Sequence, residues 1–195
     1  MNAVRQATET FRPMSRRSVL HLIMQGFFNW ARPALLAVSV LCTSNAAQAQ
    51  VVALGASNTA GKGVGSEQAF PAQLEAMLRA KGYGVHVVNA GVNGDTTAGM
   101  LARLNSAVPD GTRLVILDQA PANDLEHGLM GQHAANVAAI VGRLRARHIK
   151  TIVIPNMHVW GGQHLQPDVL HLTAEGHAAV AARLLPLVAA AIGKR

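Results

Sequence analysis

Two short segments of this chain hold residues whose types and spacing suit nucleophilic catalysis. In the first, Leu54-Gly55-Ala56-Ser57-Asn58-Thr59, a serine follows an apolar run. In the second, Asp168-Val169-Leu170-His171, an acid and an imidazole stand three residues apart. A serine hydroxyl is a weak nucleophile at neutral pH and needs a base within hydrogen-bonding reach. His171 is a candidate for that base, and Asp168 is close enough along the chain to orient its ring.

The stretch from Gly55 to Gly63 also invites comparison with a phosphate-binding P-loop. That loop has four residues between its first glycine and its Gly-Lys pair, and a Ser or Thr follows to bind magnesium. Here five residues separate Gly55 from Gly61, and Gly63 stands where the hydroxyl is needed. The G-x-S-x-G turn of α/β-hydrolases fails as well, because Thr59 occupies its second glycine position. Taken alone, the stretch remains compatible with an ordinary strand-to-helix turn.

The elements that would position these residues alternate between strands and helices. Continuous apolar runs predict strands at 51–55, 85–90, 113–117 and 151–154. Apolar residues at helical spacing predict helices around 70–78, 96–104, 137–144 and 174–192. Strands that are apolar on both faces and separated by helices predict a parallel sheet covered on both sides. Ligand sites in such α/β folds lie at the carboxyl ends of the strands.

Further polar segments fall at the predicted strand ends. Gly91-Val92-Asn93-Gly94-Asp95 follows the second strand, and Pro121-Ala122-Asn123-Asp124 follows the third. Together with the segments around Ser57 and His171, they resemble the GDSL/SGNH hydrolases over essentially the whole chain after residue 49. The resemblance is to the bacterial thioesterase, arylesterase and lysophospholipase branch. It implies a flavodoxin-like three-layer α/β/α sandwich.

The resemblance also implies a role for each matched position. Ser57 would be the nucleophile, His171 the base and Asp168 the orienting acid. The backbone N–H groups of Ser57 and Gly94 and the side chain of Asn123 would form the oxyanion hole. Removing one such donor typically costs about 3 kcal/mol of transition-state stabilisation. No cofactor and no metal are implied, and Asp95 and Asp124 are expected to brace loops.

Three departures from the family pattern bear on these expectations. Ala56 replaces the usual aspartate before the serine, and Pro121 stands where the family has a glycine. Only the thirteen residues of 155–167 join the fourth strand to Asp168, where the family fits another helix and a fifth strand. We therefore predict a sheet truncated to four strands, whose open edge is a candidate for partner contact. Trp160, in the connecting loop, would either line the pocket or pack against the core.

Residues 1–49 have the features of a secretory signal peptide. Arginines precede an apolar stretch, which ends in the small residues Ala47-Gln48-Ala49. Arg32-Pro33 interrupts the apolar run, so too few continuous residues remain to span about 30 Å of hydrocarbon. We predict cleavage after Ala49, a mature domain of residues 50–195 without a stable membrane span, and a periplasmic or secreted location.

Composition excludes several other classes. The leader carries five of the basic residues and one acid, so the net charge of +7 belongs largely to it and does not argue for nucleic acid. The single cysteine, Cys42, also lies in the leader, so the mature chain has no disulfide, thiolate nucleophile or Cys-ligated zinc. Its eight histidines show no H-E-x-x-H spacing, which gives no support for a metal site.

The favoured interpretation is a cofactor-free serine esterase that hydrolyses small-molecule carboxylic esters or thioesters through an acyl-serine intermediate. The alternative is a degenerate member of the same fold that binds an acyl or glycan ligand without turnover, for which Pro121 and the shortened C-terminal half are the support. A nucleotide-binding protein is the third hypothesis.

Overall fold

The protein is described by a computed structural model that covers residues 51–193. Its centre is one parallel sheet in the order β2-β1-β3-β4. The strands are β1 (Val51–Gly55), β2 (Val87–Gly91), β3 (Leu114–Asp118) and β4 (Lys150–Ile154). Val51 pairs with Val87 on one side and with Leu114 on the other. The prediction of a four-stranded parallel sheet is confirmed, and the predicted signal peptide lies outside the described residues.

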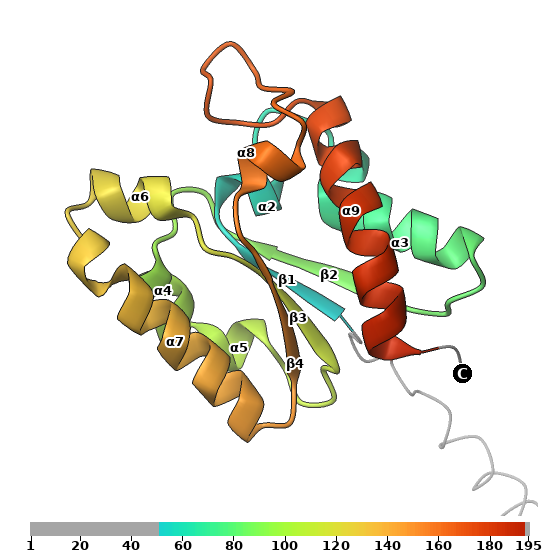
Figure 1. The fold of residues 1–195 in the computed structure, drawn as a ribbon, viewed down its shortest axis with the longest axis horizontal. Coiled ribbons are helices and arrows are strands. Elements are labelled where there is room, and N and C mark those ends of the chain that lie inside the picture. The colour runs from blue at the N-terminus through green and yellow to red at the C-terminus, as the bar shows by residue number, and fades with distance from the viewer. Residues whose placement is uncertain (1–50, 194–195) are drawn as a thin grey trace, which may run out of the picture. The chain divides into compact units, whose positions relative to one another are not determined.

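Helices cover both faces of this sheet (Figure 1). One layer holds α3 (Phe70–Ala80) and α9 (Ala174–Ile192). The other holds α4 (Thr97–Ala102), α5 (Leu104–Ala107) and α7 (Met130–Ala146). Side chains alternate along β1, so Val51 and Ala53 belong to the first core while Val52 and Leu54 belong to the second. This is the expected three-layer α/β/α sandwich.

The burial of the central strands explains why the sheet could be predicted from the sequence. Every residue of β1 and β3 is buried, because helices cover both faces and a strand flanks each edge. The outer strands β2 and β4 are only partly buried. The structure begins β2 at Val87, two residues later than predicted, and splits the helix predicted over 96–104 at Arg103.

The remaining elements are short and lie at the carboxyl ends of the strands or in the loops that follow them (Figure 1). They are α2 (Ser57–Ala60), the 3₁₀ turn η1 (Ser66–Gln68), α6 (Pro121–Glu126) and α8 (Met157–Trp160). None was predicted, because a helix of four to six residues is too short to display a period. Of these, α2, α6 and α8 contribute residues to the site described below.

The last helix, α9, is long and apolar enough to cross a membrane by length and composition alone. In the structure it is a core helix that packs against α3 and continues through Pro186. Thr173 caps its start by accepting a hydrogen bond from the backbone N–H of Gly176. Its first turn also contains His177, a fully buried histidine that stacks on Phe70.

Candidate active site

The structure brings Ser57, His171 and Asp168 into one hydrogen-bonded chain. The Ser57 Oγ lies 3.0 Å from Nε2 of His171, and Nδ1 of the same ring lies 2.6 Å from Oδ2 of Asp168. Ser57 and His171 are buried, whereas the Asp168 side chain is about half exposed. Residues more than a hundred positions apart therefore meet in the order hydroxyl, imidazole, carboxylate.

The segment that holds Ser57 depends on a close approach at Gly55, the last residue of β1. A Cβ at this position would lie 2.1 Å from Oγ1 of Thr59 and 2.7 Å from Cβ of Asp118. Only glycine fits there, so the chain turns from β1 directly into α2. Because α2 begins at Ser57, the hydroxyl stands at the carboxyl edge of the sheet, where parallel α/β folds place their ligands.

Asp168 holds the histidine segment through backbone and side-chain contacts together. Its Oδ1 accepts hydrogen bonds from the N–H groups of Leu170 at 3.0 Å and His171 at 2.9 Å. The hydrogen bond with the His171 ring, and then those two N–H groups, hold the pKa of Asp168 far below its usual value. The carboxylate is therefore ionised at neutral pH and stabilises a proton on Nδ1. That tautomer leaves Nε2 free to accept the proton of Ser57.

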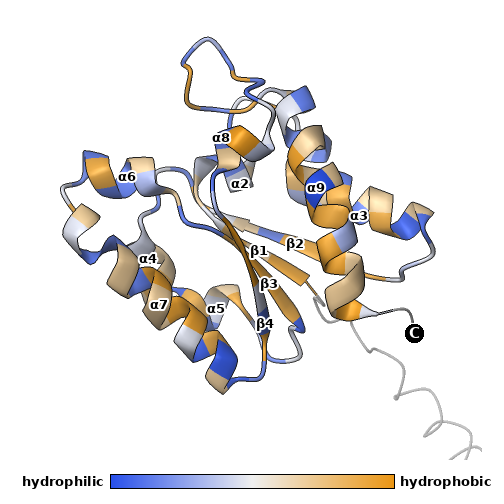
Figure 2. Ribbon diagram, viewed as in Figure 1, coloured by the Kyte–Doolittle hydropathy of each residue, from blue (hydrophilic) through white to orange (hydrophobic). Residues whose placement is uncertain are grey.

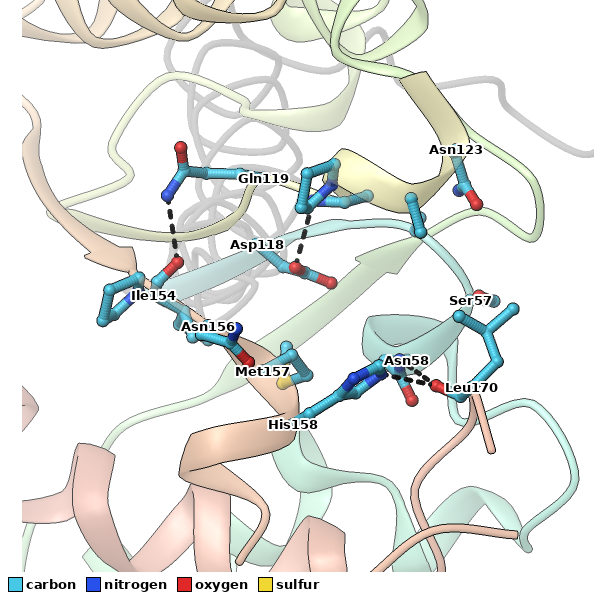
Figure 3. Close-up of a pocket in the computed structure, with 15 residues that line it drawn as sticks. Ser57, Asn58, Asp118, Gln119, Asn123, Ile154, Asn156, Met157, His158 and Leu170 are labelled. Atoms are coloured by element: carbon cyan, nitrogen blue, oxygen red, sulfur yellow. Dashed lines mark hydrogen bonds between the residues drawn. The ribbon is translucent and has the colours of Figure 1, made fainter. Parts of the chain in front are cut away.

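Asn58, which sequence reasoning did not single out, fixes the backbone on both sides of His171. Its Nδ2 donates to the carbonyl of Leu170 at 3.1 Å, and its Oδ1 accepts from the N–H of Leu172 at 2.9 Å. His158 also contacts the carbonyl of Leu170, with its Nε2 at 2.8 Å. Figure 3 shows both side chains directed at that carbonyl. Asn58, the residue next to Ser57, thus fixes the position of the His171 segment relative to α2.

Besides Ser57, the two predicted oxyanion-hole residues, Asn123 and Gly94, occupy different surroundings. Asn123 is buried in the first turn of α6 and lines the cleft beside Ser57 (Figure 3). Its Nδ2 donates to the carbonyl of Asp95 at 2.7 Å. Gly94 precedes Asp95 with a φ of 74°, but it is not among the residues that line this cleft. Pro121 is accommodated as the first residue of α6, where a missing N–H is tolerated.

Ionic and polar contacts outside the cleft connect the loops that follow β1, β2 and β3. Arg103 donates from Nε to Asp95 at 2.7 Å and from a terminal nitrogen to the carbonyl of Gly55 at 3.1 Å. Asp124 is fully buried and accepts from the N–H of Thr97 at 2.9 Å and its hydroxyl at 2.6 Å. Both aspartates make the contacts of loop braces. Arg103 was missed, because no sequence pattern joins it to Asp95, eight residues earlier, or to Gly55, 48 residues earlier.

The cleft beside Ser57 encloses about 570 Å³, including space open to solvent. Asp118 lies in its wall, and burial raises the pKa of this carboxyl despite hydrogen bonds that act in the opposite direction. Those bonds come from Ala120 N–H at 3.2 Å, from the hydroxyl of Thr59 at 3.1 Å and from the N–H of Ala56. Trp160 does not line this cleft and packs against the core. Among the described residues, no three His, Cys, Asp or Glu side chains gather as metal ligands.

Comparison with known proteins assigns the sequence to a family. The sequence model of the GDSL-like lipase/acylhydrolase family matches residues 53–183. The chain belongs to this family. The match covers the segments of Ser57, Gly94, Asn123, Asp168 and His171, so the resemblance noted from the sequence is confirmed at the level of the family.

Two curated proteins are similar in sequence to this chain. The chain is 32% identical over 116 residues to Esterase TesA of Pseudomonas aeruginosa, which is 59% of this chain and 58% of that protein. It is 36% identical over 96 residues to an arylesterase of Vibrio mimicus, which is 48% of this chain and 46% of that protein. The matched segments thus span about half the length of these relatives.

Solved structures of two proteins share the fold of this chain. A crystal structure of TesA superimposes with a TM-score of 0.63 at 23% identity, covering 73% of this chain and 99% of that one. AlinE4, an SGNH-hydrolase family esterase, superimposes with a TM-score of 0.51 at 27% identity, covering 73% and 96%. The four-stranded sandwich is therefore a variant of the GDSL/SGNH fold.

Proposed function

We propose that this chain is a serine esterase that hydrolyses carboxylic esters or thioesters through an acyl-serine intermediate. The single observation that carries the proposal is the hydrogen-bonded chain from Ser57 through His171 to Asp168. Membership of a family of lipases and acylhydrolases, and the similarity to two esterases, support the same reaction class.

In the first step, Oγ of Ser57 attacks the carbonyl carbon of the substrate. Nε2 of His171, 3.0 Å from the hydroxyl, takes its proton, and the ring becomes an imidazolium. The Asp168 carboxylate, 2.6 Å from Nδ1, stabilises that positive charge without accepting the proton. General-base assistance of this kind typically contributes about 10²–10⁴-fold to a rate.

The carbonyl oxygen becomes an oxyanion in the tetrahedral intermediate and requires donors placed in advance. We assign this role to the N–H groups of Ser57 and Gly94 and to the side chain of Asn123. For Asn123, burial at the cleft and the fixed bond to the carbonyl of Asp95 support the assignment. Because one Nδ2 hydrogen serves that carbonyl, the other is available to the substrate.

Collapse of the intermediate breaks the bond to the leaving group, which receives the proton from His171 and departs as an alcohol or thiol. The acyl group remains on Ser57. Water then attacks the acyl-serine while His171 accepts its proton, and the same proton returns to Oγ when the carboxylic acid leaves. The described residues thus supply every proton transfer that the two half-reactions need.

The assignment of the base is tested by turnover of p-nitrophenyl acetate. We expect His171→Ala to lose nearly all activity while its melting temperature stays close to that of the wild type. His127→Ala, which alters an exposed histidine at the end of α6, should retain activity. Comparable turnover by His171→Ala and the wild type would overturn the proposed mechanism.

We also propose that residues 1–49 direct export, so that residues 50–195 act as the mature enzyme in the periplasm or outside the cell. The arginine-rich start, the apolar stretch and Ala47-Gln48-Ala49 support this. Expression of the full chain followed by N-terminal sequencing of the exported protein tests it. A mature N-terminus at Gln50 is expected, and a protein that keeps residues 1–49 in the cytoplasm would contradict the proposal.

A further inference from the structure

Charged side chains in the described part of the chain are divided unequally between the two ends of the sheet. The carboxyl end comprises the segments 56–69, 92–103, 118–130 and 155–175. Its carboxylates are Glu67, Asp95, Asp118, Asp124, Glu126, Asp168 and Glu175, and its Lys and Arg residues are Lys62 and Arg103. The segments that lead into the strands have the reverse balance, with Arg79, Lys81, Arg113, Arg143, Arg145, Arg147 and Lys150 against Glu75 and Asp110.

The positive charge at the carboxyl end is largely neutralised. Arg103 is committed to Asp95 through an ion pair of 2.7 Å, and less than a quarter of its side chain is exposed. This leaves Lys62 as the exposed cation of these segments. The exposed carboxylates of the same segments are Glu67, Glu126, Asp168 and Glu175. An incoming substrate therefore meets a negative potential at the edge where the site opens.

The cleft itself offers no compensating cation. Among the fifteen described residues that line it, none is lysine or arginine. Its ionisable side chains are Asp118 and His158, and Nε2 of His158 already contacts the carbonyl of Leu170. A phosphate group carried into or next to this cleft would lose hydration without gaining a charged partner, which is costly in a partly desolvated site.

The same edge is rich in exposed apolar side chains. The structure has six large hydrophobic residues that are substantially exposed, and five lie in the segments defined above, namely Val92, Leu125, Met130, Val159 and Val169. Apolar colour on α6 and α8 is visible at this end of the sheet in Figure 2. These five residues do not line the cleft itself, but they lie in the segments at the end of the sheet where it opens. Exposed apolar groups there favour contact with an apolar ligand, because that contact removes their surface from water.

We infer that the mouth of the site selects uncharged, apolar esters and thioesters and discriminates against acyl groups carried on polyanionic, phosphate-bearing thiols. The inference rests on the proposed function and narrows its substrate class. Like charges reduce the encounter rate and affinity of a polyanion, whereas the apolar rim retains a neutral acyl substrate. Exposed charges act through a screened field, so the discrimination must weaken as salt is added.

The test compares two thioesters with the same acyl group and the same reacting bond. S-Butyryl-N-acetylcysteamine is uncharged, whereas butyryl-coenzyme A carries several phosphate charges. At an ionic strength of about 0.01 M, where the Debye length is roughly 30 Å, we expect kcat/KM to be at least about tenfold higher for the neutral thioester. The ratio of kcat/KM for the neutral thioester to that for butyryl-coenzyme A should decrease at about 1 M salt, where the Debye length is roughly 3 Å and the exposed charges are screened.

Charge-reversal variants test whether the exposed carboxylates at the carboxyl end of the sheet cause the discrimination against butyryl-coenzyme A. Glu126→Lys combined with Glu175→Lys should raise kcat/KM for butyryl-coenzyme A several-fold at low salt and leave the neutral thioester unchanged. The matched control is Asp110→Lys, which reverses a fully exposed carboxylate at the opposite end of the sheet and should leave the ratio unaltered.

Each outcome is decisive. A ratio near one that does not respond to salt would overturn the inference, as would failure to cleave either thioester by an enzyme whose Ser57 still reacts with a fluorophosphonate. Absence of that reaction in folded protein would instead overturn the proposed function itself.

Discussion

Asn58 forms hydrogen bonds with the backbone on both sides of His171: its amide nitrogen donates to the carbonyl of Leu170, and its amide oxygen accepts from the N–H of Leu172. The hydroxyl of Ser57 and the ring of His171 belong to segments far apart in the sequence, so their 3.0 Å contact depends on how those segments are held together. A side chain adjacent to Ser57 provides that connection directly.

Asn58→Ala should therefore lower kcat more than it raises KM. It removes two hydrogen bonds, each worth about 1 kcal/mol, so we expect kcat to fall by about ten- to a hundredfold as the ring of His171 loses its alignment. Asn105→Ala, at an exposed position in α5, is the control and should change neither constant. If Asn58→Ala keeps wild-type kcat, Asn58 does not position the histidine.

Arg103, which lies outside the cleft, should contribute to the stability of the folded protein. Replacing it with methionine keeps most of the aliphatic volume but removes the donors to Asp95 and to the carbonyl of Gly55. We expect a loss of about 1–3 kcal/mol in the free energy of unfolding, since the carboxylate of Asp95 is left partly buried and unpaired. Denaturant unfolding measures this, and the exposed Arg145→Met serves as the control. Equal stability of the two variants would contradict the role of Arg103.

Much of this architecture could be predicted from the sequence, because it depends on local patterns. The apolar runs of β1 and β3 identify buried parallel strands, and their carboxyl ends must converge, which predicts that Ser57 and Asn123 share one edge. The bonds of Asn58 and Arg103 could not be predicted in the same way. Asn58 bonds to residues more than a hundred positions away, and Arg103 links the nearby Asp95 to Gly55, 48 residues earlier. These contacts exist only after the segments that follow the strands have packed.

Val169 adopts a φ of 54°, a left-handed conformation that is unfavourable for a β-branched residue. Its side chain is 74% exposed, so packing does not repay the strain. We expect Val169→Gly to stabilise the protein by up to about 1 kcal/mol, the strain relieved being partly offset by the greater entropy of glycine in the unfolded chain. The control is Val159→Gly in α8, which should lower the melting temperature. A comparable decrease in the melting temperature of Val169→Gly would show that the turn carries no strain.

His177 predicts a loss of stability in mild acid. Burial lowers the pKa of this histidine from 6.5 to about 4, because the ring lies against Phe70 without a charged partner. Below pH 6.5 the unfolded chain gains a proton that the folded chain resists, so the free energy of unfolding falls between pH 6.5 and 4. The shift corresponds to about 3 kcal/mol at most.

Thermal unfolding across this pH range measures the effect. His177→Gln removes the titrating group, so the melting temperature of the variant should change less steeply with pH than that of the wild type, even if the variant is less stable at neutral pH. Parallel pH profiles for the two proteins would exclude His177 as the source of acid sensitivity.

The central claim is that Ser57 is an activated nucleophile, and reaction with a fluorophosphonate followed by intact-protein mass spectrometry tests it most directly. We expect the wild type to gain one phosphonyl group per chain at neutral pH, peptide mapping to place that group on Ser57, and Ser57→Ala to remain unmodified. Well-folded wild-type protein that gains no label, or that carries the label on another residue, would contradict the account and favour an acyl- or glycan-binding protein without turnover.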